Sequence, residues 1–231
     1  MSLCMETGNK WLLTEGAKAF GIRLGEKAEE AFDLYLRELL KWSRKINLTA
    51  IRTEKEIILK HFLDSLSVFP YLPKTATLLD IGSGAGFPGI PLKIVEPSLE
   101  IILIDSVRKK VDFERHIIRN LGLKGIEAVH GRVQDKEILQ RMRGQFDLVI
   151  SRAFSDLRIF LTVGAPFLKR GGRAIAMKSK MEEGEIRRLE EAEKGRFQLE
   201  QMFEFVLPFC TLQRSVLFYK LSQMGDAHRT F

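Results

Sequence analysis

Cysteine is scarce in this sequence, which has only Cys4 and Cys210 among its 231 residues. Two distant cysteines without a C-x-x-C spacing predict neither a disulfide framework nor a zinc site, and they favour a reducing compartment. Long apolar runs are absent too, and none approaches the roughly 20 residues of a membrane-spanning helix. The first residues show no basic segment followed by an apolar one, so we expect no signal peptide, no membrane partner and a cytoplasmic location.

The composition also lacks an excess of acidic residues. Lysine and arginine number 37 against 30 aspartates and glutamates, which gives a formal net charge of +7. A basic protein is attracted to polyanions, and nucleic acid is the commonest polyanion in a cytosol. A basic surface that is merely solvated explains the charge equally well. Charge alone therefore leaves nucleic-acid binding open.

The N-terminal third of the chain is predicted to be helical. In the segment 29–47, apolar residues at Phe32, Tyr35, Leu39, Trp42 and Ile46 recur at intervals of three and four, which indicates one buried stripe on an amphipathic helix. The segment 54–72 repeats this spacing, and prolines at 70 and 73 end it. We therefore predict an N-terminal helical extension over residues 1–73.

The remainder, residues 74–231, alternates between strand and helix. Strands are predicted at 77–81, 100–105, 125–132, 146–151 and 171–179, and helices at 91–97, 106–123, 156–168 and 182–193. Such alternation predicts an α/β fold with a doubly wound, mostly parallel sheet covered on both faces. The segments 197–209 and 215–221 are joined by a short loop and predict an antiparallel hairpin at one edge. A ligand is expected at the carboxyl ends of the strands.

One glycine-rich segment, DIGSGAGFPGIPL at 80–92, follows the first predicted strand. Gly82, Gly84 and Gly86 remove side chains where a ligand has to touch main chain, and they permit the positive φ angles of a tight turn. The next strand ends in Asp105, whose carboxylate can accept hydrogen bonds from both hydroxyls of a ribose. Asp80, before the first glycine, suits a ligand with a cationic amino-acid end, as S-adenosylmethionine has.

Two alternatives stay open for this segment. From Gly84 to Gly89 the spacing formally matches the G-x-G-x-x-G of dinucleotide sites. That register starts past the strand end, however, and Pro88 and Pro91 remove N–H groups that a pyrophosphate needs. The carboxylate of Asp80 would also repel a pyrophosphate. A structural turn without any ligand is the other alternative.

The glycine segment resembles the first motif of class I methyltransferases. More narrowly, it resembles the bacterial RsmG/GidB family, which methylates N7 of a guanine in the 530 loop of 16S ribosomal RNA. Other segments that carry the resemblance are NLTAIR (47–52), HFLDS (61–65), LIDS with the basic residues after it (103–110), GRVQD (131–135), SRAF (151–154) and MKS (177–179), with a looser similarity at QRSVLF (213–218). The resemblance implies a Rossmann-like domain with a seven-stranded sheet, S-adenosylmethionine as the cofactor, and 16S rRNA, within the 30S subunit or its precursor, as the substrate.

The cofactor residues of that family carry over to this chain through its motifs. The resemblance implies cofactor contacts at Gly82, Phe87, Asp105, Val133, Gln134 and Arg152. Of these, Asp105 would hold the ribose, Val133 and Gln134 would edge the adenine, and Arg152 would lie beside both the cofactor and the incoming base. The family usually has glutamate where this chain has Gln134, which leaves an amide able to accept from the adenine amino group. It commonly has glycine where this chain has Ser179.

The implied chemistry asks for few catalytic groups. Guanine N7 carries a lone pair in the plane of the ring, so no general base is required, and alignment alone can supply up to about 7–11 kcal/mol. The sequence is consistent with a reaction that needs no general base. It lacks the G-x-S-x-G and H-E-x-x-H motifs, a metal-ligand cluster, the Asn-Pro-Pro-aromatic motif of amino methylation and the Pro-Cys of cytosine methylation. We expect Arg152 to position the base through O6. A methyltransferase for small molecules and a non-catalytic RNA-binding or ribosome-assembly protein are the alternatives.

Several polar residues outside the glycine turn are candidates for RNA contact. These are Asn47, Arg108, Lys109 and Lys178. Exposed helix faces account for such basic residues equally well. His61 and Asp64 lie three positions apart on a predicted helix and suggest a proton relay, but a structural hydrogen-bond cluster is the stronger interpretation, because adjacent helix residues rarely converge on one substrate atom.

Overall fold

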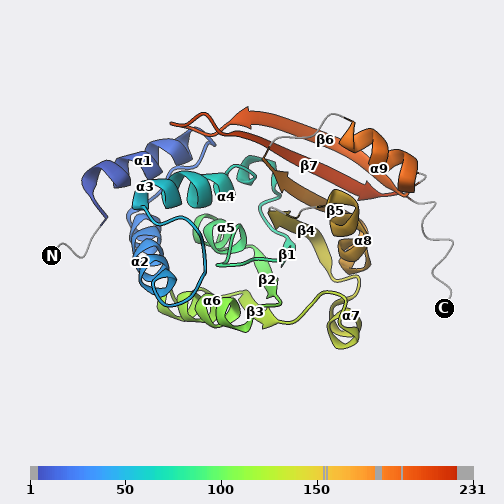
Figure 1. Cartoon of the computed structure of the whole chain (residues 1–231), viewed down its shortest axis with the longest axis horizontal. Coiled ribbons are helices and arrows are strands. Elements are labelled where there is room, and N and C mark those ends of the chain that lie inside the picture. Colours follow the sequence, from blue (N-terminus) through green and yellow to red (C-terminus); the bar gives the residue numbers. More distant parts are fainter. Residues whose placement is uncertain (1–4, 153, 155, 180–183, 194, 223–231) are drawn as a thin grey trace.

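The computed structural model describes residues 5–152, 154, 156–179, 184–193 and 195–222. Its strands form one sheet in the order β3-β2-β1-β4-β5-β7-β6 (Figure 1). The first five strands are parallel, whereas β7 runs antiparallel to both β5 and β6. The strands are β1 (Thr77–Ile81), β2 (Glu100–Asp105), β3 (Ile126–His130), β4 (Phe146–Arg152), β5 (Leu168–Lys178), β6 (Phe197–Val206) and β7 (Gln213–Leu221). The predicted seven-stranded sheet with its C-terminal hairpin is therefore confirmed.

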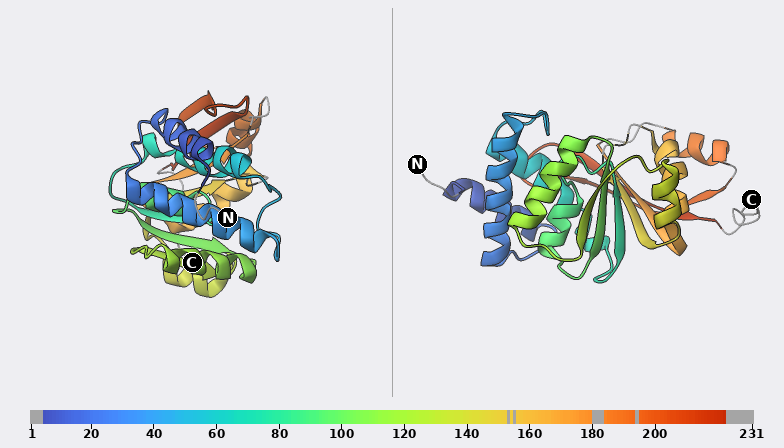
Figure 2. Two further views of the ribbon diagram at one scale, coloured as in Figure 1. Left: turned by 90° about the vertical axis from the view of Figure 1, so that its left-hand side faces the viewer. Right: turned by 90° about the horizontal axis from the view of Figure 1, so that it is seen from below.

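Helices cover both faces of the sheet (Figure 2). Successive strand residues point to opposite faces, so Leu78 and Leu79 of β1 belong to two different hydrophobic clusters. The first cluster contains residues of α1 (Thr7–Lys18), α2 (Glu26–Ser43), α3 (Glu54–Ile57), a π-helical segment (Ile58–Leu63), α4 (Asp64–Leu66), α5 (Gly89–Val95) and α6 (Arg108–Asn120). The second contains residues of α7 (Lys136–Met142), α8 (Leu157–Gly164) and α9 (Glu185–Glu193).

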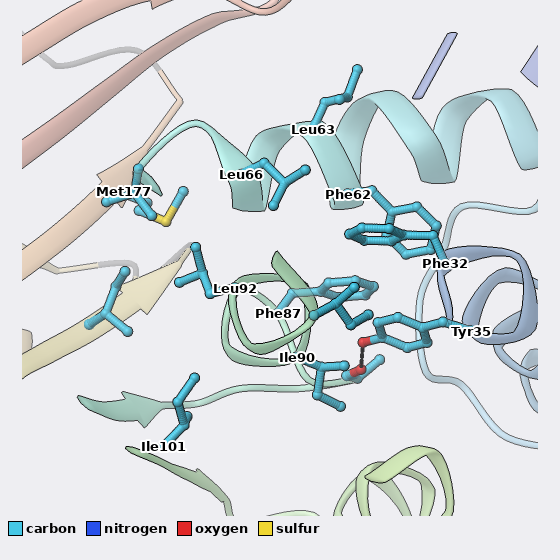
Figure 3. Close-up of a cluster of buried hydrophobic side chains, with 14 of the residues drawn as sticks. Phe32, Tyr35, Phe62, Leu63, Leu66, Phe87, Ile90, Leu92, Ile101 and Met177 are labelled. Carbon is cyan, nitrogen blue, oxygen red and sulfur yellow. Dashed lines mark hydrogen bonds between the residues drawn. The ribbon is translucent and has the colours of Figure 1, made fainter. Parts of the chain in front are cut away.

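The N-terminal helices pack directly onto the glycine turn. Phe32 and Tyr35 of α2 are fully buried, as the predicted stripe requires, and both rings contact Phe62. Phe87, at the end of the turn, stacks on Tyr35 with ring centroids 5.4 Å apart (Figure 3). Each fully buried ring of this kind stabilises the fold by about 2–3 kcal/mol. Because helices and sheet share one core here, the division of the chain at residues 73 and 74 stays a prediction.

The C-terminal hairpin extends across the sheet edge to the N-terminal helices. Tyr71, from the short 3₁₀ turn Phe69–Tyr71, stacks on Phe203 of β6 with a centroid distance of 3.8 Å. Further along, Trp11 of α1 contacts Phe209 in the loop between β6 and β7. The hairpin therefore joins the first helix to the end of the sheet, as Figure 1 shows at the top of the molecule.

Some elements differ from their predicted form. Helix α7 was not predicted, although Ile138 and Met142 are buried at helical spacing. The helix predicted over 156–168 ends at Gly164, and a 3₁₀ turn with Pro166 follows, because proline is tolerated in a first turn but not in a helix interior. No described helix is long and apolar enough to cross a bilayer. Cys210 is a half-buried free thiol, and Cys4 lies outside the described residues.

Candidate active site

A cavity of about 970 Å³ opens at the carboxyl ends of β1, β4 and β5. The strand order reverses between β1 and β4, since β2 and β3 lie on one side of β1 and β4 and β5 lie on the other. Ligands of doubly wound sheets bind at such a switch point. The turn after β1 forms one wall of the cavity. The second wall comes from the loop after α2, the π-helical segment, the end of β4, α9 and β7, and it meets the turn where His61 and Arg152 pack on Phe87.

The glycines of the turn have different physical roles. Gly82, Gly84 and Gly86 all have positive φ angles, of 73°, 66° and 93°. A Cβ on Gly82 would meet no atom within 4 Å and would project into open space, whereas a Cβ on Gly86 would collide with Ile90 and approach the Tyr35 hydroxyl. Gly82 therefore keeps a cradle open beside the cavity, and Gly86 lets α2 and α5 pack against the turn.

Buried carboxylates hold this turn from below. Asp105 accepts hydrogen bonds from the Gly84 amide (3.0 Å) and the Val107 amide (2.8 Å), so the end of β2 fixes the middle of the turn. Asp80 is fully buried and accepts from the Gly89 amide at 2.9 Å, while its other oxygen has no partner among the described residues. Burial raises the pKa of Asp80 well above its usual range.

This position of Asp80 bears on the predicted ligand. Its carboxyl group occupies the first amide of α5, which a pyrophosphate would otherwise need. The arrangement therefore disfavours a dinucleotide. Asp80 lies under the turn rather than in the cavity, so its direct contact with a cofactor stays a prediction.

Arg152, at the end of β4, lies where the second wall meets the turn. Its guanidinium donates to the Lys60 carbonyl (3.0 Å) and to the Asp64 carboxylate (3.3 Å), and it lies 5.0 Å above the ring of Phe87. Asp64 also accepts from Arg214 of β7 at 2.7 Å. The side chain of Arg152 is thus held from the sheet, the π-helical segment and α4 at once, and its orientation is fixed before any ligand arrives.

His61 connects Arg152 to the loop after α2. Its Nδ1 lies 3.0 Å from the Arg152 guanidinium, its Nε2 lies 2.7 Å from the Thr49 hydroxyl, and its ring stacks on Phe87. Burial, and then the charge of Arg152, lower the pKa of His61 to about 3, so the imidazole is neutral near pH 7. Because a guanidinium only donates, Nδ1 must accept and Nε2 must carry the proton. The structure thus contains the hydrogen-bond cluster that the sequence favoured over a relay.

The cavity wall is rich in hydrogen-bond donors. Its cationic side chains are Lys60, Arg152, Arg158, Lys178, Arg188 and Arg214. The acidic side chains beside them are engaged: Asp64 by the two arginines, Asp156 by the amide of Ile159, and Glu185 by Lys178. Lys60 and Arg158 are likewise paired, with Glu56 and Glu193, so the wall presents fixed N–H donors that suit a ligand offering acceptors. Among the described residues, no group of three or more His, Cys, Asp or Glu side chains is placed to hold a metal ion.

The predicted site residues separate into two groups. Those that line the cavity are Gly82, Gly84, Phe87, Arg152 and Lys178. Those that do not are Asn47, Asp80, Gly86, Asp105, Arg108, Lys109, Val133 and Gln134. Val133 and Gln134 follow β3. His130, the last residue of β3, pairs with Asp105 at the end of β2, so these two residues follow the strand end next to Asp105. Asn47 is exposed in the loop after α2, and Arg108 and Lys109 are exposed at the start of α6.

The cavity residues that were not predicted as site residues include Thr49, Asp64 and Arg214. The signal for the first two was present, because NLTAIR and HFLDS are among the segments that carry the family resemblance. For Arg214 the signal was weaker, because its segment QRSVLF resembles the family only loosely and its partner Asp64 lies 150 residues earlier in the chain.

Solved structures with this fold include several methyltransferases. A SAM dependent methyltransferase from Aquifex aeolicus superposes with a TM-score of 0.55 at 17% identity, covering 72% of this chain and 93% of that one. The M1A22 tRNA methyltransferase TrmK of B. subtilis also gives 0.55 at 17% identity, covering 71% of this chain and 68% of that one. At such identity the likeness shows the fold.

Sequence relatives are much closer. A protein of Geobacter metallireducens called ribosomal RNA small subunit methyltransferase G is 44% identical over 220 residues, or 92% of this chain and 96% of the relative. One of Geotalea uraniireducens with the same name is 46% identical over 208 residues, or 88% and 92%. The family model for rRNA small subunit methyltransferase G (GidB) matches residues 28–218. With its fold, its glycine turn and these matches in agreement, the chain belongs to the rRNA small subunit methyltransferase G family.

Proposed function

We propose that this protein transfers the methyl group of S-adenosylmethionine to N7 of a guanine in 16S ribosomal RNA. The observation that carries the proposal is the cavity at the switch point of the sheet, which joins an open glycine turn to a wall of fixed donors. The chain belongs to the small-subunit rRNA methyltransferase family, and we assign the glycine turn to the cofactor side and the wall of side chains to the base side.

The turn fits S-adenosylmethionine on physical grounds. Open space above Gly82 allows close approach to main chain, and the carboxylate of Asp105 stands at the end of β2, where ribose hydroxyls can donate to it. Residues proposed to contact the cofactor are Gly82, Gly84, Phe87, Asp105, Val133, Gln134 and Arg152. Asp80 and Gly86 contribute by shaping the turn from below.

The reaction needs alignment more than acid–base chemistry. The bound donor supplies a methyl carbon on a positively charged sulfur, and as N7 bonds to that carbon the carbon–sulfur bond breaks and the positive charge passes to the base. N7 attacks with an in-plane lone pair, so no residue has to remove a proton. Arg152, held by Lys60 and Asp64, orients the base, and its fixed position avoids reorganisation during transfer.

We further propose that the target guanine lies in the 530 loop, presented within the 30S subunit or its precursor, which places the enzyme in the cytoplasm. Exposed basic residues at the cofactor edge, Arg108 and Lys109, and Lys178 at the end of β5 are candidates for phosphate contacts. If the chain is divided after residue 73, the N-terminal extension supplies Thr49, His61 and Asp64 to the base side. The domain over residues 74–231 supplies the cofactor side.

The proposal is tested with 30S subunits from a strain that lacks this protein. The purified enzyme and radiolabelled S-adenosylmethionine should label these subunits, and nuclease digestion with mass spectrometry should identify 7-methylguanosine in the 530 loop. Subunits from a strain that carries the protein should accept little label. Cofactor binding without label in any RNA would instead favour a non-catalytic role, and label in another nucleoside would refute the N7 assignment.

A further inference from the structure

The neighbours of the Thr49 hydroxyl determine whether it donates a hydrogen bond to a ligand or accepts one. Thr49 Oγ1 accepts from the Ile51 amide at 3.1 Å, and it lies 2.7 Å from His61 Nε2. Because Arg152 donates to His61 Nδ1, a neutral His61 carries its proton on Nε2 and donates it to Thr49. Both lone pairs of the hydroxyl are then in use. A hydroxyl has one proton and two lone pairs, so Thr49 is left with one function, which is to donate.

Thr49 lines the same cavity as Arg152 and the glycine turn. No hydrogen-bond acceptor for its proton is found among the residues that the structure describes, and the hydroxyl stands at the end of a chain that runs from Asp64 through Arg152 and His61. This series of hydrogen bonds begins at the carboxylate of Asp64 and ends at the free hydroxyl proton of Thr49. A ligand that binds Thr49 must therefore offer a hydrogen-bond acceptor.

The chemistry of the purine edge selects the acceptor. If N7 of a base is to reach the methyl group, the edge that carries N7 has to face the cofactor side of the cavity. On that edge guanine has a second acceptor, O6, whereas adenine has an amino group, which only donates. Thr49, which is linked to Arg152 through His61, can only donate to a ligand at this point. It therefore favours guanine, whose O6 accepts, over adenine, whose amino group is itself a donor.

We propose that Thr49 is a specificity-determining residue that donates a hydrogen bond to O6 of the target guanine, with His61 as the positioning residue that fixes the direction of that bond. This inference rests on the proposed function. It assigns a role to the NLTAIR and HFLDS segments that the cofactor site does not use.

The test combines a protein change with a base change. Thr49→Val keeps the shape and removes the donor, Thr49→Ser retains the donor, and Thr14→Val on the exposed face of α1 is the matched control. Each protein is assayed on 30S subunits reconstituted with guanine or with 2-aminopurine at the target position. 2-Aminopurine keeps N7 and the 2-amino group but lacks O6. Cofactor affinity is measured separately by calorimetry.

On guanine, Thr49→Val should lower turnover about 10- to 100-fold, the size expected when a partly buried acceptor loses its hydrogen-bond donor. Thr49→Ser and Thr14→Val should stay within about threefold of the wild type. On 2-aminopurine the wild type should be slowed by at least this factor, because Arg152 is also expected to contact O6, and Thr49→Val should then be no slower than the wild type, because the acceptor is already missing.

Three results would overturn the inference. An equal loss on both bases would show that Thr49 acts only through the fold. A tenfold loss of cofactor affinity with unchanged turnover would assign the donor to the cofactor. Wild-type activity that is equal on both bases would show that O6 is not read. If the wild type methylates neither substrate, the proposed function itself fails and this inference fails with it, so the two failures are distinguishable.

Discussion

The two walls of the cavity differ in which atoms they present, mostly main chain in one and side chains in the other. The turn after β1 presents main chain, and its polar support lies underneath, where Asp80 and Asp105 bind amides of the turn and of α5. The second wall presents the side chains of Thr49, His61 and Arg152, which reach one another from three separate segments. One wall is a local structure within a single short stretch of chain, and the other exists only in the folded protein.

This difference indicates how each wall should respond to change. Apart from the ring of Phe87, the turn has almost no side-chain group to lose, so it is damaged mainly by added bulk or a displaced backbone. A side-chain wall can lose a single donor while the fold persists. Binding of the cofactor and turnover on the base should therefore be separable by mutation.

The largest effect is expected at Arg152. Arg152→Ala should lower turnover about 1,000-fold, because it removes a preorganised donor and the group that His61 and Asp64 bind. Cofactor affinity should change by less than about fivefold if the walls are separable. Single-turnover methylation and calorimetry measure the two quantities. Arg173→Ala, which breaks an exposed pair with Glu200, is the control. Lost affinity with unchanged turnover would contradict this role.

Gly82 offers the sharpest test of the main-chain wall. Gly82→Ala should weaken cofactor binding about 10- to 100-fold, because the new methyl group projects into the space beside the cavity. Gly122 is a matched control, since it also has a positive φ and open space where a Cβ would stand but lies at the end of α6, outside the cavity. Both variants should lose a similar stability of about 1 kcal/mol in urea unfolding. If the Gly82 and Gly122 variants bind the cofactor equally well, the cofactor does not lie against this turn.

A smaller effect is expected at Tyr35, which donates its hydroxyl proton to the Ala85 carbonyl in the turn (Figure 3). Tyr35→Phe leaves that carbonyl without this donor and should cost about 1–3 kcal/mol of unfolding free energy. Cofactor affinity should fall a few-fold, since the turn loses one of its supports. Tyr71→Phe, in a ring that stacks on Phe203, serves as the comparison. An unchanged affinity would show that the turn holds its shape without α2.

The smallest effect is a dependence of stability on pH. His61 has a pKa of about 3 in the folded protein against an ordinary 6.5, so below pH 6.5 the unfolded chain binds the extra proton first. Stability should therefore fall as the pH decreases from 6.5 towards 3, by about 1 kcal/mol between pH 7.0 and 5.5. His61→Gln should lose that part of the pH dependence in urea unfolding at the two pH values. Parallel losses in both proteins would contradict a neutral His61.

Much of the fold was predictable because it depends on local patterns. Alternating strands and helices, the stripe on α2 and the glycine turn each lie in one continuous segment, and all three are confirmed. Helix α7 escaped prediction because it is short and offers only Ile138 and Met142 as a repeating pair. The shared core of the N-terminal helices and the sheet was not predictable either, since both faces of that contact are ordinary apolar stripes.

The site divides in the same way. Gly82, Phe87 and Arg152 were predicted, because motifs mark them in the sequence. The network that orients Arg152 was not, since its bonds to Lys60 and to His61 span 92 and 91 residues of chain. Only the fold brings such partners together.

The π-helical segment has a consequence for the length of the chain. Its wider winding holds more residues per turn than an α-helix, and within it Lys60 turns a carbonyl, and His61 a ring, towards Arg152. Deleting one residue between Ile58 and Leu63 would let the segment rewind as an α-helix, which widens the angle between neighbouring side chains inside it from about 80° to about 100°. The directions in which Lys60, His61 and Asp64 face Arg152 would then change relative to one another. The number of residues in this segment therefore matters to the site as well as their identity.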